Sequence, residues 1–419
     1  MANKIKIGVF GAARGYVMIE VLAKHPDAEL VAVCDKYVPL LEKCKKLADE
    51  VGAKLSTYEC FDDFIKHDMD AVVLANYANE HAPFAVRCFN AGMHVLSEVL
   101  PSETLGQAVE LVEAWEKSGK IYGYAENYCY FPATFEMKMQ YEKGVLGEVR
   151  FAEGEYIHDC TSIMPQITYG DRHHWRYNHP ATFYCTHSLG PIIYITGAKP
   201  VKVIGFDTPP SDFLEKNGYT APTSGMELVE LDNGAIVKSM HGQLKREPTM
   251  NFYSLYCEKG MMETDRFDHD FKHVNLYIEG EQSCKGDLKN YVPAPYISNE
   301  LADSINSHGG SDFYPTHFFI EKILGREDGK YCIDLYQALS MSLPGIMAHR
   351  SLLDGNKPYE VPDFSKKEMR DKYRNDNKSV NKNISSGDDL LPISSKEMKV
   401  LDDSVYDYVK DLWEKGLPG

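Results

Sequence analysis

Short apolar runs alternate with longer amphipathic segments at the start of the chain, and this alternation constrains the fold more than any other feature. The runs read as strands at Ile5–Phe10, Glu29–Cys34, Asp70–Ala75, His94–Ser97 and Ile121–Ala125, and the segments between them as helices at Val17–Lys24, Pro39–Val51, His81–Ala91 and Leu105–Ser118. Buried strands separated by helices predict a parallel sheet with right-handed crossovers. We therefore expect an N-terminal, doubly wound α/β sheet.

The pattern changes near Asn127. After a helix expected at Thr134–Lys143, strand-like stretches follow at Val149–His158, Val201–Asp207, Gly225–Leu231, Ala235–Met240, Tyr253–Glu258, Gly260–Thr264 and Val274–Glu279. They predict an α/β domain with an open mixed or antiparallel sheet, and helices return at Asp312–Leu324 and Cys332–Leu353. The polar stretch Phe364–Ser395 reads as a loop before a last helix at Ser395–Lys415.

The length of 419 residues exceeds what one compact core usually holds. We expect one domain at residues 1–126, a second at residues 127–363, and a polar linker with a C-terminal helix packing on the body at residues 364–419.

Composition argues against several classes of protein. The net charge of −17 disfavours nucleic-acid and anionic-membrane partners, which need a basic face. No run of about 18 apolar residues suggests a membrane span. The ten cysteines include no CxxC pair, and the chain starts without an apolar leader, so we expect reduced thiols and a cytoplasmic location.

A glycine-containing turn follows the first strand and suggests a dinucleotide site. Such a turn lets the backbone approach a pyrophosphate at a helix N-terminus, and here it consists of Gly11, Ala12, Ala13, Arg14 and Gly15. Asp35 ends the second strand, where a carboxylate binds the ribose hydroxyls of NAD and repels the 2′-phosphate of NADP. The alternatives are an ordinary tight turn and Asp35 as a helix cap, while Lys36 leaves some tolerance for phosphate.

A set of further motifs runs in order along the chain: Asp35, Asn79–Pro83, Ala91–Glu98, Gly144–Val149 and Ala348–Ser351. In these residues the sequence resembles the Gfo/Idh/MocA family of oxidoreductases. The resemblance implies an NAD-binding Rossmann domain followed by a substrate domain, a sugar or cyclitol substrate, and a homodimer or homotetramer formed through the open sheet. It also implies cofactor contacts at Asn76, His81 and Glu98.

Two positions depart from the ordinary dehydrogenases of this family. Val99 stands where those enzymes carry a catalytic lysine, and Phe183 stands where they carry an aspartate four residues before a histidine. Neither side chain can transfer a proton, so simple alcohol oxidation by the usual residues is in doubt.

The NAD-dependent glycosidases of glycoside hydrolase family 109 are similar at these positions. The similarity extends to Glu126–Tyr130 and to Tyr184–Pro191. It implies that Glu126, Tyr184 and His187 lie in a sugar site, and position suggests Tyr156 and Arg176 as further substrate residues.

The expected chemistry is oxidation at C3 of a glycoside, elimination, addition of water and re-reduction. His187 would handle the O3 proton, Tyr184 or Tyr156 the C2 hydrogen, and Trp175 would stack on the sugar. Each of these side chains could instead serve packing, and Glu126 could be a structural hydrogen-bond partner. The alternative functions are a sugar or cyclitol dehydrogenase and a non-catalytic nucleotide- or sugar-binding regulator.

Two further motifs have open roles. The His-rich segment Asp171–His179 matches no recognised set of metal ligands, so we expect a polar loop and no metal. Asp312, at the end of His308-Gly309-Gly310-Ser311-Asp312, could cap the helix that follows it.

Overall fold

The computed structural model describes residues 4–247 and 250–418, so the ends of the expected first and last segments, residues 1–3 and 419, lie outside it. The chain divides into two compact units. Unit 1 comprises residues 1–135, 294–339 and 364–375, and unit 2 comprises residues 136–293, 340–363 and 376–419. Both units therefore combine segments that are distant in the sequence.

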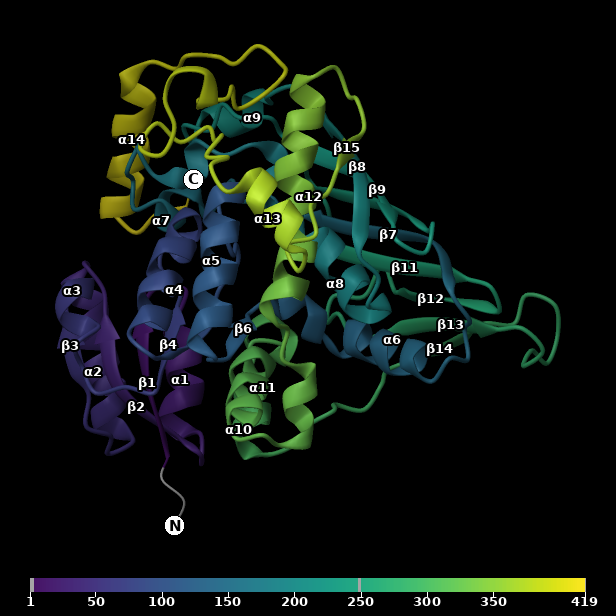
Figure 1. The fold of residues 1–419 in the computed structure, drawn as a ribbon, viewed down its shortest axis with the longest axis horizontal. Helices are drawn as coiled ribbons and strands as arrows, with labels where there is room; N and C mark the ends of the chain where they lie inside the picture. The colour runs from purple at the N-terminus through teal and green to yellow at the C-terminus, as the bar shows by residue number, and fades with distance from the viewer. Residues whose placement is uncertain (1–3, 248–249, 419) are drawn as a thin grey trace. The chain divides into compact units, whose positions relative to one another are not determined.

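Unit 1 is built on a six-stranded parallel sheet (Figure 1). Its spatial order is β3-β2-β1-β4-β5-β6, with bounds β1 Ile5–Phe10, β2 Ala28–Cys34, β3 Ser56–Tyr58, β4 Ala71–Leu74, β5 His94–Ser97 and β6 Tyr122–Tyr124. Every residue of β4 is buried, as expected for a strand covered on both faces. This order, with the switch between β1 and β4, is that of a Rossmann sheet.

Helices cover the parallel sheet of unit 1. The crossover helices are α1 Tyr16–Lys24, α2 Val38–Glu50, α3 Phe61–Phe64, α4 His81–Asn90 and α5 Leu105–Ser118. Later segments add α10 Glu300–Ser304, α11 Phe313–Ile323 and α13 Lys367–Tyr373. Helix α1 packs against α2 and α11, and α4 packs against α5 (Figure 1). Residues 294–339 and 364–375, from the second half of the chain, thus complete unit 1.

Unit 2 contains an open nine-stranded mixed sheet. Its order is β14-β13-β12-β11-β7-β10-β9-β8-β15, with bounds β7 Val149–Ile157, β8 Pro200–Asp207, β9 Ser224–Leu231, β10 Ile236–Gly242, β11 Asn251–Cys257, β12 Gly260–Thr264, β13 Val274–Ile278, β14 Lys289–Tyr291 and β15 Tyr359–Glu360. Strands β7 and β10 pair in parallel, and the other neighbours pair antiparallel.

Helix α8, Thr186–Thr196, packs on the centre of this sheet, against β7, β10 and β11 (Figure 1). The packing is close because β7 presents Gly154, where an added Cβ would lie 1.8 Å from the Ser188 carbonyl oxygen. The remaining helices are α6 Pro132–Glu142, α7 Met164–Ile167, α9 Asp212–Glu215, α12 Leu335–Leu353 and α14 Asp403–Glu414.

The expected fold class, a Rossmann sheet followed by an open mixed sheet, is confirmed. Two local expectations were wrong: the last helix begins at Asp403 and not at Ser395, and the polar stretch after Phe364 contains helix α13. The side chain of Asp402 accepts a hydrogen bond from the Ser404 amide, which makes it the N-cap that starts the last helix. Within the described residues, no helix is long and apolar enough to cross a membrane.

Candidate active site

The turn between β1 and α1 can be formed only with glycine at two positions. Gly11 has a φ of +97°, and a Cβ there would lie 2.3 Å from the Ala75 carbonyl oxygen. A Cβ on Gly15 would lie 2.3 Å from the Gly11 carbonyl oxygen. The backbone therefore passes close to β4 and leads directly into α1, leaving the first amides of that helix at the carboxyl end of the sheet.

Asp35 and Asn76 lie at the ends of the strands on either side of β1. The Asp35 carboxylate accepts hydrogen bonds from the amides of Ala12 (2.7 Å) and Tyr37 (2.8 Å), and so ties the end of β2 to the glycine turn. Asn76, just beyond β4, has a buried Oδ1 with no hydrogen-bond partner among the described residues. A glycine turn, a fixed carboxylate and an unpaired buried amide oxygen together fit a dinucleotide such as NAD.

Arg14, inside the glycine turn, joins two buried carboxylates. Its Nη2 lies 2.9 Å from Glu98 Oε1 and 2.9 Å from Asp312 Oδ1. Burial lowers the pKa of the guanidinium, but the charges of Glu98 and Asp312 outweigh it and raise that pKa above its usual range. Glu98 Oε2 also accepts a hydrogen bond from the amide of Val99 (3.2 Å). The turn is therefore held to the end of β5 by an ion pair.

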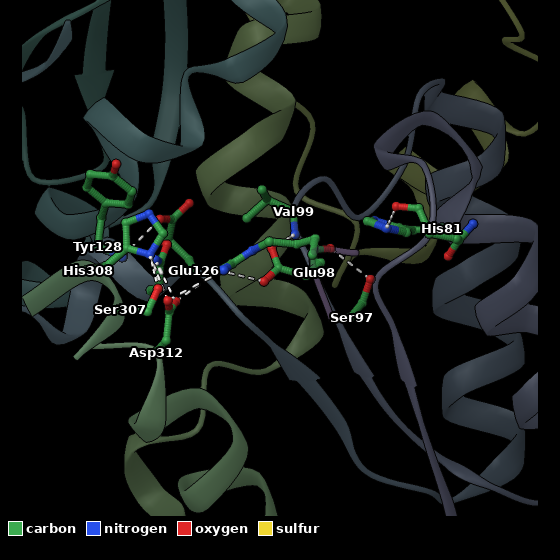
Figure 2. Close-up of polar contacts among 12 residues, drawn as sticks. His81, Ser97, Glu98, Val99, Glu126, Tyr128, Ser307, His308 and Asp312 are labelled. Carbon is green, nitrogen blue, oxygen red and sulfur yellow. Dashed lines mark hydrogen bonds and ion pairs between the residues drawn. The ribbon is translucent and has the colours of Figure 1, made fainter. Parts of the chain in front are cut away.

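The Asp312 side chain accepts hydrogen bonds from three other residues and does not cap the helix, as the sequence had suggested it could. It occupies the N-cap position of α11, but its side chain makes no capping hydrogen bond. The carboxylate instead accepts from Arg14, from Asn127 Nδ2 (2.9 Å) and from His308 Nδ1 (2.7 Å), as Figure 2 shows for His308. Burial raises the pKa of Asp312, but His308 and Arg14 hold it well below its usual range.

His81 supports the loops behind this site. Its Nδ1 lies 2.8 Å from the Leu100 carbonyl oxygen and its Nε2 3.3 Å from the Asn76 carbonyl oxygen. Burial lowers the pKa of His81 to about 4, although these backbone contacts raise it. The ring is thus neutral near pH 7 and links the segments that follow β4 and β5.

Glu126 follows β6 and is fully buried. Its carboxylate accepts a hydrogen bond from the Tyr128 amide (3.3 Å). Figure 2 shows Glu126 in the same group as Tyr128, His308 and Asp312, and the rings of Tyr128 and His308 lie 6.2 Å apart. This group lies at the carboxyl end of the parallel strands, where open α/β sheets bind ligands.

In unit 2, the three expected catalytic residues come together. The ring of His187 lies 4.8 Å from that of Tyr156 and 5.3 Å from that of Tyr184, measured between centroids. His187 is in the first turn of α8 and Tyr156 is near the end of β7, so the close packing at Gly154 brings them together. The Tyr156 hydroxyl also lies 2.8 Å from Nδ1 of His158.

Trp175 and Arg176 belong to the same aromatic group. Trp175 stacks on Tyr184 with centroids 6.0 Å apart and planes at 11°, and the Arg176 guanidinium lies 4.6 Å from the Trp175 ring centroid. Sequence reasoning missed His158 as a site residue. The signal was its spacing of two residues from Tyr156, which puts both side chains on one side of an extended chain, although β7 itself ends at Ile157.

The His-rich segment has structural contacts. His174 Nδ1 accepts a hydrogen bond from the Arg176 amide (3.2 Å), and His179 Nδ1 lies 3.0 Å from the Pro180 carbonyl oxygen. Burial, with smaller contributions from Arg176 and His241, lowers the pKa of His179 to about 4. Across residues 4–247 and 250–418, no three His, Cys, Asp or Glu side chains are grouped as metal ligands would be.

The fold and the glycine turn of unit 1 define an NAD-binding Rossmann domain, and comparison with known proteins agrees. Residues 5–126 match the family model described as the oxidoreductase family, NAD-binding Rossmann fold, of Gfo/Idh/MocA. Residues 276–371 match the model for the C-terminal domain of glycosyl hydrolase 109. The chain therefore combines a Gfo/Idh/MocA NAD-binding domain with a segment of the glycosyl hydrolase 109 C-terminal type, and the resemblance noted in the sequence is confirmed.

Curated relatives of this chain are named as glycosyl hydrolase family 109 proteins. A glycosyl hydrolase family 109 protein of Solibacter usitatus is 25% identical over 402 residues, covering 86% of this chain and 88% of the relative. Glycosyl hydrolase family 109 protein 1 of Bacteroides thetaiotaomicron is 25% identical over 405 residues, covering 86% and 85%.

Solved structures share the fold. Levoglucosan dehydrogenase in complex with NADH and L-sorbose has a TM-score of 0.70 at 14% identity, covering 87% of this chain and 100% of that one. Scyllo-inositol dehydrogenase from Lactobacillus casei has a TM-score of 0.66 at 18% identity, covering 86% and 99%.

Proposed function

We propose that this chain is an NAD-dependent enzyme that cleaves a glycoside through transient oxidation at C3 of the sugar. The observation that carries the proposal is the cluster in unit 2, where the imidazole of His187 lies against the phenols of Tyr156 and Tyr184. The relatives named glycosyl hydrolase family 109, and Val99 at the position of the usual lysine, support it.

The proposed reaction needs separate bases at O3 and C2. NAD, when bound, supplies the acceptor for the C3 hydride and its later return, so there is no net redox change. His187 accepts the O3 proton. The C3 ketone acidifies the C2 hydrogen, and as a base removes it, the electron pair expels the glycosidic oxygen, which takes up a proton. Water adds across C1 and C2 before C3 is reduced again.

We assign the C2 base to Tyr156 and keep Tyr184 as the alternative. The hydrogen bond between the Tyr156 hydroxyl and His158 Nδ1 supports this choice, because the imidazole can take the phenol proton. Tyr184 is stacked on Trp175, which favours a role in shaping the site.

The remaining site residues would bind and orient. We propose that Glu126 orients a sugar hydroxyl, that Arg176 holds an acidic or acetamido substituent, and that Trp175 contributes an aromatic wall for the sugar. On the cofactor side, we propose that the turn from Gly11 to Gly15, with Ala12, Ala13 and Arg14, binds the pyrophosphate. Asp35 binds the ribose, and Asn76, His81 and Glu98 line or support the nicotinamide end.

A panel of aryl glycosides tests the proposed function. The purified protein is incubated with each glycoside while aglycone release and NADH absorbance are recorded together. Release without net NADH is the expected result. Net NADH accumulation would show a dehydrogenase instead, and neither signal across a broad panel would favour a binding protein without catalysis.

We also propose a homodimer or homotetramer that uses the open face of the nine-stranded sheet. On that face Ile236, Phe151 and Tyr256 are cross-strand neighbours, and they are 37%, 37% and 45% exposed. Such a row on a monomer would be an apolar patch in water. Sedimentation velocity should give an oligomer for the native protein and a monomer for Phe151→Arg, and a monomeric native protein would contradict the proposal.

A further inference from the structure

One buried carboxylate connects the glycine turn of unit 1 to a segment far along the chain. Asp312 is 1% exposed and lies 298 residues beyond Arg14, outside the β-α repeats of the Rossmann sheet. Its two oxygens accept from the guanidinium of Arg14, the amide of Asn127 and the imidazole of His308. These donors come from three separate segments: the β1–α1 turn, the short helical turn Asn127–Tyr130 after β6, and the turn before α11.

The turn before α11 has a conformation that places His308 against Asp312. His308 has a φ of +47°, a left-handed conformation that is uncommon for residues other than glycine, and Gly309 and Gly310 follow at +60° and +90°. Because the depressed pKa keeps Asp312 ionised, Nδ1 of His308 must carry the hydrogen that it shares with the carboxylate. The carboxylate thus has a donor on each oxygen.

Arg14 is consequently fixed within the turn that approaches the dinucleotide. A guanidinium is planar and carries several N–H donors in fixed directions. Ion pairs with two carboxylates therefore leave the Arg14 side chain little freedom to rotate. Glu98 holds it from β5 and Asp312 from the start of α11. Arg14 lies in the turn whose backbone suits a pyrophosphate, so its remaining N–H groups can face the same ligand.

We propose that Asp312 is a positioning residue of the NAD site, which acts on the cofactor through Arg14. The segment 307–312 then controls dinucleotide affinity although it lies outside the Rossmann repeats. The inference deepens the proposed function because it rests on the use of NAD, but it does not depend on the sugar or on cleavage.

The direction in which Asp312→Asn changes NADH affinity distinguishes a positioning role of Asp312 from a purely electrostatic one. Asp312→Asn removes a negative charge near an anionic cofactor, so a purely electrostatic effect would tighten NADH binding. Loss of the ion pair that orients Arg14 would instead weaken NADH binding. Positioning therefore predicts weaker binding, and we expect the dissociation constant for NADH to rise about tenfold, as is typical when a hydrogen bond to a charged group is lost.

The test is a fluorescence titration of the full chain with NADH in a double-mutant cycle. Asp312→Asn and Arg14→Met should each weaken NADH binding, and the double variant should bind no more weakly than Arg14→Met alone. An equal further loss in the Arg14→Met background would overturn the proposal, because it would show that Asp312 does not act through Arg14. Tighter or unchanged binding by Asp312→Asn would also overturn it.

A control variant separates positioning from general stability. Asp334→Asn alters another carboxylate of unit 1, which lies just before α12 and accepts a hydrogen bond from the Gln337 amide in the first turn of that helix. It should leave NADH affinity at the native value, whatever its effect on the melting temperature.

If Asp312→Asn does not fold, Arg14→Lys answers the same question. Lysine keeps the positive charge in the turn but lacks the planar guanidinium that pairs with two carboxylates at once. The proposal predicts at least about fivefold weaker NADH binding, comparable to one lost charged hydrogen bond. Native affinity in Arg14→Lys would overturn it.

Discussion

At the scale of single residues, Tyr156 and Tyr184 differ in their partners although both rings lie against His187. Tyr156 shares a hydrogen bond with His158, whereas Tyr184 is stacked on Trp175. Tyr156→Phe keeps the ring and removes the hydroxyl, so NADH should still form on the enzyme while solvent deuterium exchange at C2 falls. A general base typically contributes about 10²–10⁴-fold, which a single-turnover measurement resolves.

The matched variant is Tyr184→Phe, measured on the same glycoside. It should exchange deuterium at C2 at close to the native rate. The opposite result, in which Tyr184→Phe abolishes exchange and Tyr156→Phe does not, would transfer the C2 base to Tyr184. His187→Ala should suppress both hydride transfer and exchange, because the O3 proton would have no acceptor.

Asp35 contributes both a charge and a structural contact at the cofactor turn. Asp35→Asn keeps an oxygen that can accept from the Ala12 amide but removes the negative charge. NADH binding should weaken by about 1–3 kcal/mol as charged hydrogen bonds to the ribose are lost. NADPH binding should change less or improve. Parallel titrations with the two cofactors measure this difference, and equal weakening of both would assign Asp35 only to the turn.

At the scale of secondary structure elements, the contact between β7 and α8 holds His187 beside Tyr156. Gly154→Ala would place a Cβ against the Ser188 backbone carbonyl, which cannot move without shifting the helix. We expect a loss of unfolding free energy of about 1–3 kcal/mol, typical of overpacking, together with reduced glycoside cleavage. Urea denaturation measures the stability change.

The control for that variant is Gly234→Asn in the β9–β10 turn. Gly234 has a φ of +81°, no atom of the described residues lies within 4 Å of an added Cβ, and asparagine tolerates this conformation. Its stability should stay within about 1 kcal/mol of the native protein. A Gly154→Ala variant as stable as Gly234→Asn would show that α8 can move away from the sheet without cost.

At the scale of the whole molecule, buried neutral histidines make stability depend on pH. Burial lowers the pKa of His25, His81 and His349 to about 4. In the unfolded chain these rings titrate near their ordinary pKa of about 6.5, so between these values the unfolded chain binds more protons. Stability should therefore be complete above about pH 6.5 and fall as the pH drops toward 4, by up to about 2 kcal/mol per buried ring at pH 5.

Thermal melts between pH 7.5 and 4.5 measure this dependence. In His349→Gln, an amide replaces a ring whose Nε2 lies 2.9 Å from the Pro392 carbonyl oxygen, so a donor remains but the titration is lost. The drop in melting temperature between pH 7 and pH 5 should be smaller in this variant than in the native protein. The exposed His173→Gln should leave the drop unchanged, and an identical drop in all three proteins would contradict the assignment.

The sequence by itself determined the fold class, because hydrophobic periodicity is a local property. Buried apolar strands such as β4, with helices between them, specify a parallel sheet, and the turn at Gly11 admits only glycine. Element ends were less accurate, and the three-residue β3 was missed because so short a strand carries no periodic signal. The family resemblance predicted Tyr156, Tyr184 and His187 as catalytic residues of one site, and the structure brings their three rings together.

Only the tertiary structure decided which side chains the candidate site residues contact. The ion pair between Arg14 and Asp312 spans 298 residues of sequence, and no local pattern distinguishes an aspartate that caps a helix from one that holds a distant arginine. Likewise, only the approach of α8 to Gly154 brings the ring of His187 to that of Tyr156. Periodicity fixes which face of an element is buried, but long-range packing decides which side chains meet there.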